Sequence, residues 1–171
     1  MGYSKDKQDL DFVTRTQELL VQYDEMEKDS QKKYEITLLI NCFVGLIIVP
    51  QSKWNDSISP EEISSERWGI DPSMISICKD GKLVDEPKNL RNVARHLRNS
   101  ISHYHFEIVN NSNHEIGSIK FQDFLPNNER NETFELTIEI EPLKKFLLKF
   151  SEEMIRVMEE EGKKKKYNQT S

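Results

Sequence analysis

The sequence predicts a mainly α-helical fold, an antiparallel helical bundle with a small β-hairpin or meander inserted before the last helix. Four long segments place apolar residues at helical spacing, whereas residues 133–140 alternate apolar and polar residues, as a strand with one covered face does. With 171 residues, the chain fits one domain at 1–160, followed by a disordered lysine-rich tail at 161–171.

The first two helices are expected at roughly residues 6–28 and 33–49. The first carries an apolar stripe between charged residues, so one face should pack on a core. The second is apolar nearly all round, and Pro50 should end it because proline lacks an amide donor. The uncharged run from Ile36 to Val49 is shorter than the roughly 20 residues of a membrane span. We therefore expect a buried helix, and a membrane association only as a weak alternative.

The middle of the chain, residues 51–87, is interrupted by repeated proline and glycine residues. We expect an irregular connection here, with short helices near residues 61–68 and 72–78. A third long helix is expected at about 87–104, with Pro87 in its first turn.

Extended structure is expected after this third helix. Residues 106–109 and 116–121 are weaker strand candidates that would join the alternating segment 133–140 in an antiparallel meander. A fourth helix is expected from about Pro142 to Glu160, where apolar residues again form one stripe.

Charge and composition narrow the functional classes. A formal net charge of -6 argues against a protein that coats nucleic acid through bulk electrostatics, so any such contact must be local. Cys42 and Cys78 lie in apolar surroundings, which favours buried free thiols over a disulfide. No metal or other cofactor is expected, because convincing ligand spacings and glycine-rich phosphate loops are missing. The first residues lack a signal-peptide pattern, and we expect a cytoplasmic protein.

One face of the third helix collects nitrogen-rich side chains. At about 100° per residue, the polar side comprises Arg91, Asn92, Arg95, Arg98, Asn99, Ser102 and His103, with His96 at its edge. Every surface helix has a polar face, so a solvated surface is the simplest interpretation. However, no acidic residue and no lysine occurs between Asn89 and Phe106, whereas solvated helices favour Glu and Lys pairs. Arginine, asparagine and histidine together suit an anion such as a phosphodiester.

The spacing of Arg98 and His103 limits how both side chains could contact the same ligand. Five positions apart, they point about 140° from one another on a straight helix, whereas Asn99 and His103 can touch. Either the helix is distorted near its end, or a second copy of the chain supplies part of the site in a symmetric dimer.

The segment "RNSISH", Arg98 to His103, matches the R-x4-H motif of the HEPN superfamily (higher eukaryotes and prokaryotes nucleotide-binding), including the polar residue after the arginine, Asn99. Further blocks between about Lys33 and Glu160, such as "YEITLLINCFVGLIIVP" and "LKKFLLKFSEEM", resemble a small prokaryotic HEPN group found on plasmids and genomic islands. The resemblance implies a HEPN-like helical bundle that dimerises to bring two motifs into one cleft. It also implies metal-independent endoribonuclease activity, in related systems as a toxin or in defence against phage.

Each candidate residue then has an expected role. His103 would act as base or acid, Arg98 would stabilise the charged phosphate, and Asn99 would orient His103 or donate to the phosphate. The remaining candidates are assigned to RNA binding or orientation: Arg91, Arg95, Ser102, His96 and His105. A solvated face is the alternative for Arg91, Arg95 and His96, and a structural hydrogen bond is the alternative for His105. The expected partners are an RNA substrate, a second copy of the chain and, as a further candidate, a neutralising antitoxin. Some HEPN proteins have no nuclease activity, so a module that binds nucleotide, RNA or a protein is the alternative.

Overall fold

The computed structural model describes residues 8–26, 35–48, 53–110, 116–126 and 128–169. The chain divides into two units, the first formed by Met1–Ile58 with Leu147–Ser171 and the second by Ser59–Phe146. The predicted end of the second helix at Pro50 lies outside the described residues.

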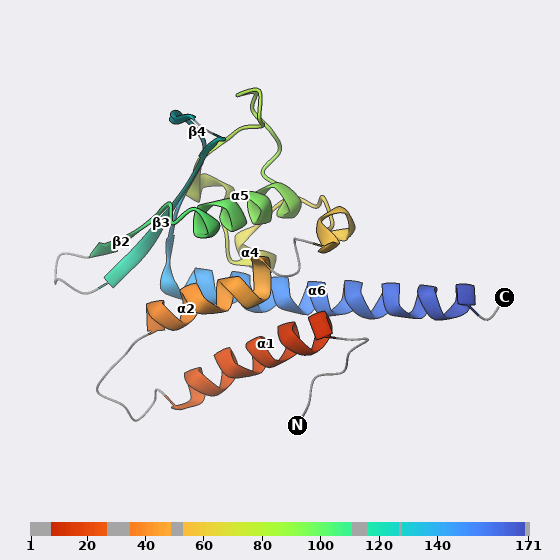
Figure 1. Cartoon of the computed structure of the whole chain (residues 1–171). Helices are drawn as coiled ribbons and strands as arrows, with labels where there is room; N and C mark the ends of the chain where they lie inside the picture. Colours follow the sequence, from red (N-terminus) through yellow and green to blue (C-terminus); the bar gives the residue numbers. More distant parts are fainter. Residues whose placement is uncertain (1–7, 27–34, 49–52, 111–115, 127, 170–171) are drawn as a thin grey trace. The chain divides into compact units, whose positions relative to one another are not determined.

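The first unit is helical (Figure 1). Its elements before the last helix are α1 (Gln8–Met26), α2 (Glu35–Phe43), the π-helical turn η3 (Val44–Ile48) and the 3-10 turn η4 (Asn55–Ser57). The positions of α1, α2 and η3 match the helices predicted at 6–28 and 33–49. The π-helical geometry of η3 was not predicted, because apolar periodicity does not distinguish a π turn from an α turn.

The α2–η3 segment supplies core residues, as its apolar sequence predicts. Leu39, Phe43 and Leu46 are fully buried. η3 approaches α1 at Gly45, where a Cβ atom would lie 2.6 Å from Oγ1 of Thr16. Glycine is therefore needed at this position to let the two helices approach each other. Among the described residues, no helix combines the length and the apolar character that a bilayer crossing requires.

The last helix, α6 (Ile140–Gln169), is longer than predicted at both ends. It belongs to the second unit up to Phe146 and to the first unit from Leu147. Helical structure continues beyond Glu160 into the lysine-rich stretch, whose charges do not prevent continuation of a helix. The division into a domain at 1–160 and a tail at 161–171 stays a prediction.

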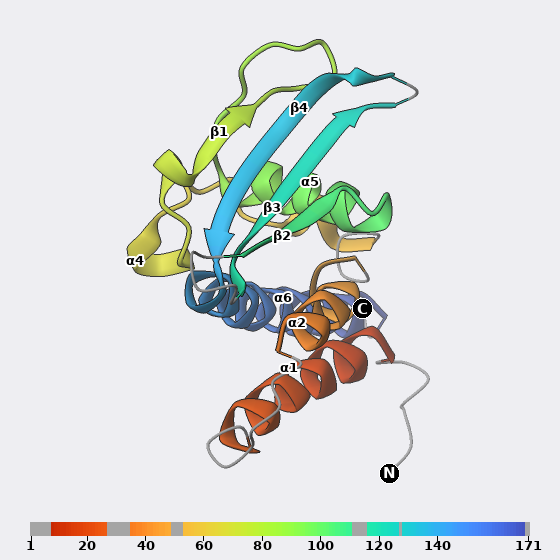
Figure 2. The ribbon, with the colours of Figure 1, turned by 90° about the vertical axis from the view of Figure 1, so that its left-hand side faces the viewer.

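The second unit contains a four-stranded antiparallel sheet in the order β1-β4-β3-β2 (Figure 2). Its strands are β1 (Ile75–Cys78), β2 (Phe106–Asn110), β3 (Ile116–Leu125) and β4 (Asn128–Glu139). The predicted class, a mainly α-helical bundle with a small β insertion, is therefore wrong, because the fold is mixed α and β. The predicted strands were too short, since polar stretches and bulges interrupt the alternation in the long β3–β4 pair.

A second correction concerns residues 72–78, where a short helix was predicted. Only a 3-10 turn, η5 (Pro72–Met74), forms there, and β1 follows it. Ile75 pairs with Leu136 and Cys78 pairs with Phe134, so pairing with β4 determines the structure of a segment too short to show a period. The other short helix, α4, is confined to Ser65–Trp68.

Helix α5 (Leu90–Ser102) packs against β3 (Figure 2), and it carries the motif from Arg98 to its C-cap, His103. Its N-cap is Asn89, whose side-chain oxygen accepts a hydrogen bond from the amide of Asn92 at 2.9 Å. Pro87 precedes this cap and does not lie in the first turn, because the asparagine side chain fixes the start of the helix. The apolar side is buried as expected, including Leu90, Val93 and Leu97.

Candidate functional site

The C-terminal end of α5 departs from helical geometry at His103. Tyr104 adopts a left-handed conformation with φ of 59°. The amide of Tyr104 donates to the carbonyl of Ile101 at 3.2 Å, and the amide of His105 donates to that of Ser100 at 2.7 Å. These two bonds define a Schellman motif, with His103 as the C-cap at φ -102° and ψ 6°. A distorted helix end is one of the two arrangements that the Arg98 to His103 spacing required.

An open cavity of about 1130 Å³ lies in the second unit, and its wall includes the C-terminal half of α5, the loop after β1 and the β3–β4 hairpin. Five of the predicted residues line it: Arg95, Arg98, Asn99, His103 and His105. Lys79 and Arg130 add positive charge from the other elements, and Asp80 and Asp123 add negative charge. Arginine and lysine therefore outnumber the acidic residues of the lining, which favours an anionic ligand.

Three predicted residues lie elsewhere. Arg91 and Ser102 are not part of the cavity lining. His96 is fully buried and contacts Asp123, which lines the cavity, and Glu86, which does not. The sequence had placed it at the edge of the polar face, where burial by the sheet could not be foreseen.

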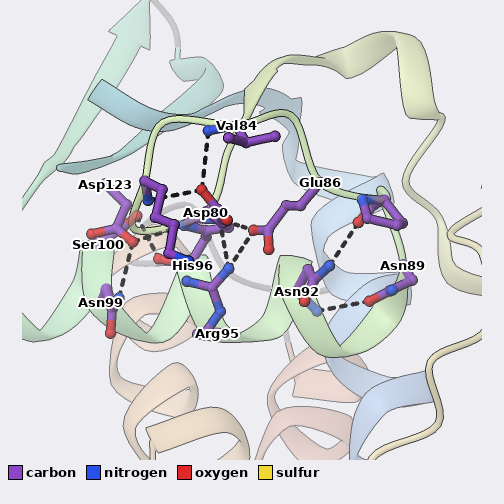
Figure 3. Close-up of polar contacts among 12 residues, drawn as sticks. Asp80, Val84, Glu86, Asn89, Asn92, Arg95, His96, Asn99, Ser100 and Asp123 are labelled. Atoms are coloured by element: carbon purple, nitrogen blue, oxygen red, sulfur yellow. Dashed lines mark hydrogen bonds and ion pairs between the residues drawn. The ribbon is translucent and has the colours of Figure 1, made fainter. Parts of the chain in front are cut away.

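Asn99 connects Arg98 to β3. Its side-chain oxygen accepts hydrogen bonds from Nε and Nη2 of Arg98, at 3.2 and 2.8 Å. Its side-chain nitrogen donates to Oδ2 of Asp123 at 2.9 Å (Figure 3). The arginine of the motif is thus linked to a carboxylate on the sheet. The expectation that Asn99 orients His103 has no counterpart in these contacts.

His96 lies between two carboxylates (Figure 3). Its Nδ1 is 2.7 Å from Oδ2 of Asp123, and its Nε2 is 2.7 Å from Oε1 of Glu86. Its ring stacks on Phe134 with centroids 4.7 Å apart. A neutral imidazole has one N–H, whereas both nitrogens here face carboxylate oxygens, and Nε2 also lies 3.1 Å from Nη2 of Arg95, a group that only donates. Arg95 also pairs with Glu86, so this carboxylate contacts both Arg95 and Nε2 of His96.

Asp123 is an almost fully buried carboxylate whose charge is stabilised by its neighbours. Burial by itself would raise its pKa. Hydrogen bonds from His96, Asn99 and the Phe124 amide, together with the charge of His96, outweigh burial and lower the pKa of Asp123 below its ordinary value. Asp123 therefore stays ionised at neutral pH.

A folded-back loop brings Glu86 to α5. Oδ1 of Asp80 accepts hydrogen bonds from the amides of Lys82 and Val84, at 2.8 and 3.0 Å. These bonds, Val84 first, lower the pKa of Asp80. The amide of Glu86 donates to the carbonyl of Cys78 at 3.0 Å, which closes the loop beside the end of β1. The loop thereby contributes both to the cavity lining and to the support of His96.

Sequence reasoning missed Asp123, Glu86, Lys79 and Arg130 as members of the site. A usable indication existed for Asp123. Ile119, Phe121 and Asp123 occupy alternate positions of β3 and are all buried, so the carboxylate stands where the pattern calls for an apolar residue. Such a position implies a buried polar partner.

A metal ion would find one group of ligands among the described residues. Ligand atoms of Cys78, Glu86 and His96 lie within 4.8 Å of one another. A cation there would compete with Arg95, which already pairs with Glu86. Burial also raises the pKa of the Cys78 thiol to about 11, which disfavours the thiolate. The expectation that no metal is used stays a prediction.

The cavity thus brings the arginine and the histidine of the R-x4-H motif, Arg98 and His103, into one lining. The chain belongs to the HEPN family described as HEPN pEK499 p136, whose model matches residues 1–170. The resemblance inferred from the sequence is thereby confirmed. Proteins of the HEPN family are commonly ribonucleases or have functions related to nucleotides. No curated protein and no solved structure matched the chain.

Proposed function

We propose that the chain is a metal-independent endoribonuclease that cleaves RNA by attack of a 2′-hydroxyl on the adjacent phosphodiester. The observation that carries this proposal is that Arg98 and His103 line the same cavity. Family membership supports it. The proposed role is that of a toxin or a phage-defence effector in the cytoplasm.

His103 would perform the proton transfers. It is exposed at the C-cap of α5, so its imidazole is accessible to an RNA strand in the cavity. An imidazole titrates near neutral pH and therefore serves either to accept the proton of the 2′-hydroxyl or to protonate the leaving 5′-oxygen.

Arg98 would stabilise the phosphate. A guanidinium has five N–H donors, and Arg98 directs donors of Nε and Nη2 to Asn99. Further donors of the same group are thus available to the phosphate oxygens, where negative charge develops during attack. Arg95, Lys79 and Arg130 would hold the neighbouring backbone phosphates through their positive charges.

The test is cleavage of defined RNAs by purified protein in excess EDTA. Arg98→Ala and His103→Ala should each lower the rate by about 100-fold or more, the range of a lost acid–base group or charge stabiliser. Arg91→Ala is the matched control, because it also removes an arginine of α5 but lies outside the lining, and it should cleave within about threefold of wild type. An RNA with a 2′-deoxy residue at the cleavage site should resist cleavage. Equal cleavage by wild type, Arg98→Ala and His103→Ala would refute the proposal.

The alternative function is a non-catalytic module that uses the same cavity to bind RNA or nucleotide. The positive lining favours this function as much as it favours cleavage. Wild type that binds RNA with dependence on Arg98, but leaves every RNA intact, would support the module over the ribonuclease.

A second copy of the chain is the proposed protein partner, and a neutralising antitoxin is a further candidate. Light scattering tests the dimer directly. Because Arg98 and His103 line the cavity of one chain, a mixture of Arg98→Ala and His103→Ala proteins should stay inactive. Recovery of activity on mixing would instead place a working pair across two chains.

A further inference from the structure

The orientation of the Asn99 side chain decides what Arg98 meets. An amide that rotates by 180° about its last bond exchanges its oxygen and nitrogen, and so replaces an acceptor by a donor. In the observed orientation, the oxygen faces two donors of Arg98 and the nitrogen faces Asp123. The reverse orientation would place an NH2 group against the guanidinium and an oxygen against the carboxylate. Both contacts would then be repulsive.

Asp123 is held firmly enough to impose this choice. Its side chain is 5% exposed. Oδ2 accepts hydrogen bonds from His96 and Asn99, and Oδ1 accepts one from the amide of Phe124 at 2.9 Å. His96 is itself fixed by Glu86 at its other nitrogen. The carboxylate therefore has little freedom to move, and it offers an acceptor and no donor to Asn99.

We propose that Asp123 is a positioning residue for Arg98, acting through the side chain of Asn99. In this scheme the orientation of Arg98 depends on β3, which carries Asp123, as well as on α5, which carries Arg98 and Asn99. His96 and Glu86 belong to the support of Asp123 and contact no substrate in this scheme. The catalytic part of this inference rests on the proposed ribonuclease activity.

Asp123→Asn is the informative substitution because it preserves shape and removes charge. One position, Oδ2, serves two donors. If the new NH2 group takes the place of Oδ2, it faces the donors of His96 and Asn99. If it takes the place of Oδ1, it faces the amide N–H of Phe124. The network is therefore broken in either orientation. We expect kcat to fall by about 10- to 100-fold, the range for a lost hydrogen bond to a charged group. KM should change by no more than about twofold, because Asp123 positions Arg98 but does not hold the RNA.

Two further variants separate positioning from a merely structural role. Asn99→Ala removes the connection without touching the buried ion pair, and it should reproduce the loss in kcat. In an Arg98→Ala background, single-turnover rates should be insensitive to Asp123→Asn, because the group that Asp123 positions is gone. Glu135→Gln removes a carboxylate from the neighbouring strand β4, outside the cavity lining, and should leave kcat unchanged. An equal loss in the wild-type and Arg98→Ala backgrounds would overturn the proposal.

A spectroscopic readout makes the test independent of cleavage. The Nε–H signal of Arg98 in 15N NMR spectra can be assigned by its disappearance in Arg98→Lys. It should exchange slowly with water in wild type and faster in Asn99→Ala and Asp123→Asn. Such a dependence in a protein that cuts no RNA would uphold the positioning role while the ribonuclease proposal fails. An Arg98 signal and a kcat that are both indifferent to Asn99→Ala would refute the positioning role, even if Asp123→Asn does not fold.

Discussion

Tyr104 is the residue at which α5 turns into β2, and its backbone carries a cost. A left-handed conformation costs a non-glycine residue about 1–2 kcal/mol. Tyr104 is 79% exposed, although its ring contacts Phe106 with centroids 4.7 Å apart. The conformation is retained because it allows the Schellman bonds that place His103 at the cavity and direct the chain into β2.

Tyr104→Gly and Tyr104→Val separate this backbone cost from the ring contact. Both variants lose the contact with Phe106, but only glycine adopts a left-handed φ without steric strain. We expect Tyr104→Val to have a free energy of unfolding about 1–2 kcal/mol below that of Tyr104→Gly. Urea denaturation measures the difference. Equal stabilities would show that Tyr104 does not need the left-handed conformation.

The residues of the motif and those that support it differ in how far they could be predicted. Arg98 and Asn99 lie on one helix, so their shared face follows from helical geometry. Asp123 is separated from Asn99 by 24 positions and Glu86 from His96 by 10, and both reach α5 through strand pairing or loop closure. The sequence of α5 contains no information about these partners. The sequence of β3 does indicate that Asp123 is buried, because this carboxylate occupies a position where the alternation calls for an apolar residue.

Among the elements, helices were predicted better than strands. The long helices other than α2 carry an apolar period of their own, which is a local property, and α2 belongs to a segment that is apolar nearly all round. β1 has four residues without a period, and its structure follows from antiparallel pairing with β4, which is distant in the sequence. The same dependence explains why the sheet was underestimated and the fold class was wrong.

The contact between α1 and η3 gives a prediction about helix packing. In Gly45→Ala, the new methyl group would overlap Thr16, with 2.6 Å to Oγ1 and 2.8 Å to Cγ2. We expect the free energy of unfolding to fall by about 1–3 kcal/mol, as for other overpacked cores. Gly81→Ala is the control, because a Cβ there meets nothing within 4 Å. If both variants lose the same stability in urea denaturation, the close packing of these helices is not what requires glycine.

The sheet gives a prediction about pH. Glu135 of β4 accepts from Lys120 of β3 and from Ser76 of β1, and these bonds, Lys120 first, lower the pKa of Glu135. A carboxyl group whose pKa is lowered by folding stabilises the folded state at pH values above its unfolded-state pKa of about 4.3. This stabilisation is lost as the pH falls through the folded-state pKa. Glu135→Gln should therefore be less stable than wild type by about 0.5–1 kcal/mol near neutral pH, and the gap should shrink in acid. Urea denaturation across this pH range measures it, with exposed Glu139→Gln as the control. A gap that widens in acid would contradict the sign.

For the whole molecule, the division into two units assigns the candidate site to one of them. The described residues that line the cavity belong to the second unit, Ser59–Phe146. Family membership over residues 1–170 could be anticipated from blocks distributed along the chain. The class of site followed from one six-residue motif, whereas the cavity itself depends on three elements that only the fold brings together.

The two cysteines report on the two units separately. Cys42 lies in the first unit and Cys78 in the second, and both are buried free thiols. Burial raises the pKa of each to about 11. Both should therefore resist iodoacetamide at mildly alkaline pH in the native protein and react rapidly in urea. Mass spectrometry of the two peptides along a urea series would show whether the units open together. Rapid native alkylation of either thiol would contradict its burial.

The position of β3 inside the sheet affects how the site would open. β3 lies between β4 and β2, whereas β1 and β2 form the two edges of the sheet. Amide hydrogens of interior strands exchange with solvent only through rare openings that approach global unfolding, whereas edge strands fray at lower free energy. Asp123 lies on β3 opposite Phe134 of β4, two residues beyond Phe121, the last residue of β3 that pairs with β2, whereas His103 lies at a helix end next to an edge strand. We therefore expect the part of the cavity wall that orients Arg98 to open more rarely than the part around His103.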